Sequence, residues 1–169
     1  MTEPRADRPF MPGYGVLPAA EGSGLLAWAE AERRLTVSHD YWCATVRPDG
    51  GPRLHPMCPV IDGDELYAFL VPSPKRRDLH RDGRYAMHSF PADDNEDAFS
   101  ITGSAAEVPD RRVRDEVAAR FLAERTWSDP PPGFDEQELF AFDIETCLLT
   151  TTTGHGDPHP THTVWHAHA

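Results

Sequence analysis

The densest group of cationic side chains lies at residues 73–77. Ser73, Lys75, Arg76 and Arg77 all fall within this short stretch. A phosphate dianion binds best to fixed cations combined with hydroxyl or backbone donors, and the stretch supplies both. An isolated Lys-Arg-Arg is more often a solvated turn, but here it stands in a chain with 16 Lys and Arg against 28 Asp and Glu. We therefore predict an anion site in which Lys75 and Arg76 are the main cations. Ser73 is an accessory donor, and Arg77 is left as a surface charge.

A second candidate site precedes this cluster in a stretch that contains two prolines. Its members are His55, Pro56, Met57, Cys58, Pro59 and Val60. Proline has no amide hydrogen, so it keeps a strand irregular and leaves neighbouring carbonyls free for a ligand. An ordinary edge strand is the alternative explanation. His55 either contacts a ligand or closes a hydrogen bond inside the fold, and Cys58 is expected to be a buried filler rather than a nucleophile. No side chain is assigned as catalytic.

The elements that must position these residues are mostly strands. Alternating apolar and polar residues, separated by turn sequences such as Pro-Asp-Gly-Gly, predict strands at residues 41–47, 53–61, 66–71, 85–90, 98–108 and 139–149. Amphipathic spacing predicts a helix after Ser23 and another capped by Asp110. One or two helical turns are expected over residues 73–83. This order predicts a mainly β fold, a six-stranded Greek-key barrel with flanking helices.

The order and spacing of the motifs resemble a known family. The segment YWCATVRPDGGPRLHPMCPVIDGDELYAFLVPSPKRRDLHRDGRYAMHSF resembles the pyridoxamine 5'-phosphate oxidase-like superfamily of flavin- or deazaflavin-dependent reductases. In that family an Ala-Thr-Val-x-x-Asp-Gly strand precedes a proline-containing strand against the flavin. A Ser-x-Lys motif and a Leu-x-x-(Asp/Asn) helix over the phosphate then follow. Residues 44–50, 53–61 and 73–82 occupy these places, and the resemblance extends over residues 41–149.

The resemblance implies a split barrel that binds FMN. The phosphate would contact Ser73, Lys75 and Arg76, and the flavin ring would lie against residues 55–60. The implied function is an FMN-binding oxidoreductase acting on an unidentified small organic substrate. A deazaflavin-dependent reductase is one alternative, because the acidic tail of the deazaflavin coenzyme would also suit Lys75, Arg76 and Arg81. A non-catalytic flavin or haem carrier is the other.

The resemblance also implies a homodimer. Two barrels placed side by side can bury a flavin that one small barrel cannot enclose. The strand expected at residues 66–71 is apolar on both faces, which is a further argument for a subunit contact. Family members often end in a short strand whose aromatic side chain packs near the flavin of the other subunit. Thr163-Val164-Trp165 matches that feature, so Trp165 is included among the cofactor-binding candidates.

Composition narrows the classes of partner and the compartment. The net charge of -12 disfavours nucleic acids and anionic membranes. The sequence contains no uninterrupted run of 18 apolar residues, so no membrane-spanning helix is predicted. The three cysteines are widely separated and fit reduced thiols, so a cytoplasmic protein is expected. Three segments are predicted. They are a proline-rich arm at residues 1–21 that forms no continuous regular element, a cofactor-binding domain at 22–153, and a His-rich tail at 154–169.

The tail has five of the nine histidines, which raises the question of a metal site. They are His155, His159, His162, His166 and His168. Their spacing has no helical or zinc-finger context and no accompanying carboxylate pattern, so we expect a mobile polar tail and assign no metal ligands.

Overall fold

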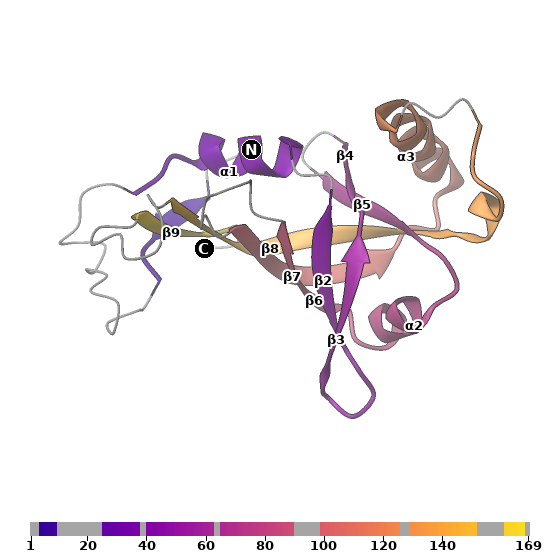
Figure 1. Cartoon of the computed structure of the whole chain (residues 1–169), viewed down its shortest axis with the longest axis horizontal. Helices are drawn as coiled ribbons and strands as arrows, with labels where there is room; N and C mark the ends of the chain where they lie inside the picture. Colours follow the sequence, from indigo (N-terminus) through magenta and orange to yellow (C-terminus); the bar gives the residue numbers. More distant parts are fainter. Residues whose placement is uncertain are drawn as a thin grey trace.

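The computed structural model describes residues 4–9, 25–37, 40–62, 65–89, 99–125, 129–151 and 161–167. The strands in these ranges are β1 (Arg5–Asp7), β2 (Tyr41–Val46), β3 (Pro52–Met57), β4 (Val60–Asp62), β5 (Glu65–Leu70), β6 (Arg84–Ser89), β7 (Phe99–Glu107), β8 (Glu138–Thr151) and β9 (Thr161–His166). The helices are α1 (Trp28–Val37), α2 (Pro74–Arg81) and α3 (Arg111–Glu124), with a 3-10 turn, η2, at Phe134–Glu136. The predicted mainly β fold with flanking helices is confirmed (Figure 1).

The long strand β8 joins the two halves of the antiparallel sheet. The strand order is β1-β9-β8-β7-β6-β2-β3, and β5 also pairs with β8. The first half of β8 pairs with β5 and its second half with β9, while β7 follows the opposite edge along most of its length. Next to Gly103 this β7–β8 pairing has a bulge, where an added Cβ would lie 1.9 Å from the carbonyl oxygen of Asp143. Only glycine fits such a close approach of two backbones.

The predicted strand at residues 53–61 is interrupted in the structure. It divides at Cys58 and Pro59 into β3, which pairs with β2, and β4, which pairs with β5. Pro59 has no amide hydrogen to contribute to a ladder, so the chain can change partners at this point. The division moves β3 next to α2, where the candidate site lies.

Two of the helices begin where the sequence predicts. The side chain of Asp110 caps α3 by accepting a hydrogen bond from the backbone N–H of Arg112, at 2.8 Å. Ser73 caps α2 in the same way through the backbone N–H of Arg76, at 3.2 Å. The first helix begins at Trp28, and its predicted cap Ser23 lies outside the described residues.

Strand β5 is covered on both faces within one chain. Leu66, Ala68 and Leu70 belong to the main core inside the sheet. Tyr67 packs in a second cluster with Val117 of α3. The apolar character of both faces is therefore explained by α3, and it is not an argument for a subunit contact.

Two terminal segments contribute strands. Residues Arg5–Asp7, within the predicted arm, form the short strand β1 and pair with β9. Residues Thr161–His166 form β9 and pair with β8, so Thr163-Val164-Trp165 lies in a short strand as the resemblance implied. The expectation of a mobile tail was wrong for these residues, because backbone pairing along an open strand edge does not depend on a strong apolar pattern. His155, His159 and His168 lie outside the described residues.

None of the helices in the described ranges is both long enough and apolar enough to cross a lipid bilayer.

Candidate anion-binding site

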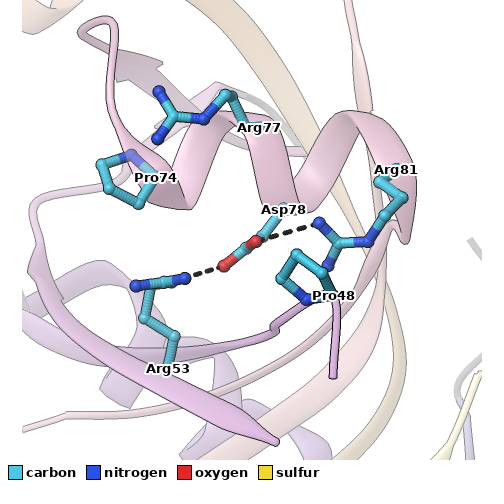
Figure 2. A pocket seen from close by; sticks show the side chains of 6 residues that line it. All are labelled: Pro48, Arg53, Pro74, Arg77, Asp78 and Arg81. Atoms are coloured by element: carbon cyan, nitrogen blue, oxygen red, sulfur yellow. Dashed lines mark hydrogen bonds and ion pairs between the residues drawn. The ribbon is translucent and has the colours of Figure 1, made fainter. Parts of the chain in front are cut away.

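A cavity of about 220 Å³ lies between helix α2 and the hairpin formed by β2 and β3. Its lining residues are Pro48, Arg53, Pro74, Arg77, Asp78 and Arg81 (Figure 2). Three of these side chains are guanidinium groups and one is a carboxylate. The lining therefore has a formal charge of +2 in a chain whose net charge is -12. Such a local excess of positive charge favours an anionic ligand.

Asp78 holds two of the three arginines in place. Its carboxylate accepts a hydrogen bond from Arg53 Nε at 2.7 Å and another from Arg81 Nη1 at 3.1 Å (Figure 2). The side chain of Asp78 is only 3% exposed. Burial alone would raise its pKa, but the hydrogen bonds from Arg53, Arg81 and Thr45 outweigh burial, and the pKa is lowered. Asp78 is therefore a charged anchor for the guanidinium groups.

Local geometry explains why these residues converge. Arg77 and Arg81 are four residues apart on α2, so they lie on the same side of the helix. Arg53 faces Thr45 across the β2–β3 ladder, and the hydroxyl of Thr45 donates to Asp78 at 3.2 Å. Arg81 also donates to the carbonyl oxygen of Val46. Arg77 is exposed, and its side chain has no hydrogen-bond or ion-pair partner within the described ranges, so the guanidinium group can bind a ligand without losing a protein contact.

Lys75 and His55 lie beside this cavity without lining it. Lys75 donates from Nζ to the carbonyl oxygen of Pro56, at 3.2 Å. Burial lowers the pKa of His55, and the charges of Lys75 and Arg53 lower it further. The Nε2 atom of His55 is buried and has no hydrogen-bond partner among the residues described. A buried polar atom of this kind normally has a partner, so a ligand group or water is expected there.

The other two predicted phosphate contacts, Ser73 and Arg76, already have structural partners. The Ser73 hydroxyl caps α2. Arg76 donates to the carbonyl oxygens of Leu70 and Glu136, at 3.4 and 3.2 Å. Its Nε atom also lies 3.3 Å from a carboxylate oxygen of Glu138. Arg76 thus connects α2 to η2 and to the start of β8.

These contacts predict that Arg76→Ala mainly affects folding. The variant loses an ion pair and leaves two carbonyl oxygens without their donor, which should lower the free energy of unfolding by about 1–3 kcal/mol. Denaturant unfolding would measure the loss. Arg84→Ala is the matched control, because the Arg84 side chain is 75% exposed and, within the part of the chain that the structure describes, pairs with Asp82 alone. A change within about 0.5 kcal/mol for both variants would contradict the structural role of Arg76.

The predicted ring-binding stretch at residues 55–60 has two environments. Met57, Pro59 and Val60 are buried, whereas Pro56 is exposed. Cys58 is exposed as well, and its thiol donates to Asp40 at 3.2 Å, so its prediction as a buried filler was wrong. Burial of its surroundings and the hydrogen bond to Asp40 raise the pKa of the thiol, which does not favour a nucleophile. The strand break at Pro59 brings Cys58 to the surface.

Trp165 lies in β9 and is 1% exposed within the main core. Its ring meets the ring of Trp28 edge-on, with centroids 5.6 Å apart. The structure does not bring Trp165 into the lining of the anion cavity.

Sequence reasoning did not assign Arg53 to the site, left Arg77 as a surface charge, and considered Arg81 only for a deazaflavin tail. The spacing of Arg77 and Arg81 was a usable signal, since residues four apart share a helix face. The contribution of Arg53 had no such signal. It reaches Asp78 only because α2 packs on the β2–β3 hairpin, as Figure 2 shows.

No protein-family model and no curated protein matches the sequence. Solved structures match with TM-scores near 0.6. A conserved hypothetical protein from Mycobacterium tuberculosis has a TM-score of 0.62 and 17% identity, over 85% of this chain and 87% of that one. An FAD-binding protein from Mesorhizobium loti has a TM-score of 0.59 and 20% identity, over 82% of this chain and 94% of that one.

Three further solved structures share this fold. A pyridoxamine 5'-phosphate oxidase candidate from Listeria innocua has a TM-score of 0.57 and 15% identity, over 72% of this chain and 93% of that one. An F420 reductase has a TM-score of 0.55 and 21% identity, over 73% of this chain and 94% of that one. A heme-binding protein from Mycobacterium smegmatis has a TM-score of 0.60 and 14% identity, over 79% of this chain and 55% of that one. At such identities the likeness shows the fold and no more. The chain therefore has the split-barrel fold of the pyridoxamine 5'-phosphate oxidase-like proteins.

Proposed function

We propose that the chain is an oxidoreductase that binds a phosphorylated flavin-type cofactor, FMN in the first instance, by its phosphate. The observation that carries the proposal is the convergence of Arg53, Arg77 and Arg81 on one cavity. Their three positive charges exceed the single charge of Asp78 by two, which matches the charge of a phosphate dianion. Arginine also has the planar, multidentate donor geometry that phosphate recognition favours.

The size of the cavity supports binding of the phosphate end alone. Pockets that enclose a whole drug-sized ligand measure about 300–1,000 Å³, whereas this cavity measures about 220 Å³. The ring system would lie outside it. We propose that Lys75 and the stretch at residues 55–60, including His55, border the rest of the cofactor. His55 lies near Lys75, and its buried Nε2 atom has no hydrogen-bond partner among the described residues.

A cofactor only partly enclosed by one chain is also consistent with a homodimer, which we retain as part of the proposal. A second copy would cover the exposed remainder of the cofactor. When bound, a flavin would supply hydride or electron transfer, and this chain's own residues would bind and orient it. The neutral form of His55, favoured by burial and by the neighbouring cations, suits a hydrogen-bonding role toward that ligand. The substrate would be a small organic molecule.

Comparing FMN with riboflavin tests the phosphate assignment directly. Riboflavin has the same ring and no phosphate, and charge-assisted hydrogen bonds contribute about 1.5–3 kcal/mol each, so FMN should bind at least about tenfold more tightly. Quenching of flavin fluorescence on titration with the full chain measures both affinities. Equal affinities would remove phosphate recognition from the proposal. Reduction of the bound flavin by a nicotinamide donor would then distinguish an enzyme from a carrier.

The deazaflavin coenzyme is the second candidate within the same proposal. The three-arginine cavity supports it too, because this coenzyme also carries a phosphate and has a longer acidic tail. The fold likeness to an F420 reductase is compatible with this alternative. Titration with the deazaflavin coenzyme in parallel with FMN and haem would select among them: the ligand with the lowest dissociation constant identifies the cofactor class.

A further inference from the structure

Three side chains of types that can bind a metal ion lie near the C-terminal end of helix α2 and come from three different elements. His80 is in the last turn of α2, Glu107 is the last residue of β7, and Glu138 is the first residue of β8. One nitrogen of His80 and one carboxylate oxygen from each glutamate all lie within 4.8 Å of one another. The three residues are outside the lining of the arginine cavity, so this group is independent of the cofactor proposal.

The distances are close to those of a metal site. A four-coordinate Zn²⁺ ion binds nitrogen and oxygen at about 2.0–2.2 Å, which places its ligand atoms roughly 3.3 Å apart. In the structure His80 Nε2 lies 2.7 Å from a Glu138 oxygen, and His80 Nδ1 lies 3.9 Å from a Glu107 oxygen. These two contacts involve different ring nitrogens, whereas an ion would bind only one of them. The observation that supports a site is that one nitrogen and one oxygen from each glutamate all lie within 4.8 Å of one another, so the side chains would have to close by up to about 1.5 Å to share an ion.

The backbone and a ring contact restrict where these side chains can move. Glu107 is paired with Phe140 across the β7–β8 ladder, which fixes the two strand ends relative to each other. The imidazole of His80 meets the ring of Phe140 edge-on, with centroids 5.1 Å apart. The three ligands are therefore held by a helix and two paired strands, as a binding site requires, rather than by a loop.

The charges also favour a cation. With a neutral imidazole, the two carboxylates carry two negative charges, and Arg76 beside Glu138 offsets only one of them. The side chains of His80 and Glu107 are both more than 40% exposed, so an ion can reach them from solvent. A combination of imidazole with carboxylates is a common ligand set for Zn²⁺ and related divalent ions.

We propose that His80, Glu107 and Glu138 form a binding site for a divalent transition-metal ion, with Zn²⁺ preferred and water completing the coordination. The imidazole contributes one nitrogen and each glutamate contributes one oxygen, while Arg76 remains beside Glu138 Oε2, the oxygen that also faces His80. The site would link the end of α2 to the ends of β7 and β8.

The test is a Zn²⁺ titration of the full chain by calorimetry, before and after substitution. Loss of a residue that only hydrogen-bonds to a metal ligand already weakens metal binding by about 10- to 100-fold, so Glu107→Gln, which removes a direct ligand, should weaken it by at least about tenfold. Glu116→Gln is the matched control, since Glu116 is exposed on α3 and its one ion pair among the described residues is with Arg112. His80→Asn should repeat the loss, which keeps the test decisive if one variant folds poorly.

The tail histidines are removed in a separate variant, so that Zn²⁺ bound outside the proposed site is not counted as binding to it. Replacing His155, His159 and His168 by alanine should leave one site, and that site should disappear when Glu107→Gln is added. Loss of all Zn²⁺ binding in the tail variant would overturn the proposal. An unchanged affinity and stoichiometry in both Glu107→Gln and His80→Asn would overturn it as well.

Discussion

Arg77→Ala should weaken FMN binding by about ten- to a hundredfold and leave the stability of the cofactor-free chain almost unchanged. A charge-assisted hydrogen bond contributes about 1.5–3 kcal/mol, and each 1.4 kcal/mol corresponds to a factor of about ten in affinity. Arg77 is the cleanest of the three arginines to change, because it lines the cavity and has no ion-pair partner within the ranges described. Substituting Arg53 or Arg81 would also remove an ion-pair partner of the buried Asp78.

The specificity of this loss is as important as its size. Riboflavin affinity should stay within about twofold in Arg77→Ala, since the ring and ribityl chain are unchanged and the missing contact is to phosphate. Arg111→Ala is the matched control, because Arg111 is 92% exposed on α3 and does not line the cavity. An equal loss for FMN and riboflavin would indicate a general disturbance of the site. No loss for FMN would exclude Arg77 from phosphate binding.

Asp78→Ala should cost about 3–5 kcal/mol of unfolding free energy. Removing one partner of a buried charge network leaves the others uncompensated, and here Arg53, Arg81 and Thr45 would all lose their acceptor. Denaturant unfolding measures the change. Asp115→Ala on the exposed side of α3 is the control and should change stability by less than about 0.5 kcal/mol. Equal stability of the two variants would show that the Asp78 network is not structural.

The same comparison has a predictable dependence on pH. The pKa of Asp78 is lowered in the folded chain, so its carboxylate stabilises the fold fully above its ordinary value of 3.8. This contribution is lost as the pH falls from 3.8 through the lowered pKa. The difference in unfolding free energy between the parent and Asp78→Ala should therefore be complete at neutral pH and shrink in acid. A difference that grows with falling pH would contradict the assignment of Asp78 as an ionised anchor.

The sequence alone determined the local parts of this protein. Turn residues and alternating apolar side chains located the main strands, and Asp110 marked the start of one helix. These features depend on contacts within a few residues, so the pattern along the chain contains them. The basic stretch at residues 73–77 correctly placed a cluster of cations on the first turns of α2.

Only the tertiary structure decided what those cations contact. Arg76 turned toward Glu138 and two carbonyl oxygens, while Arg77 joined Arg53 and Arg81 at the cavity. Strands β1 and β9 likewise depend on pairing with each other and with β8, which no local pattern records. Arg53 and Asp78 are 25 residues apart in the sequence. Their contact forms only because the strand is interrupted at Pro59, the chain returns through β5, and α2 then packs on the β2–β3 hairpin. Residue type fixes which charges are present, but packing between distant elements decides which of them are neutralised within the fold and which remain available for a ligand.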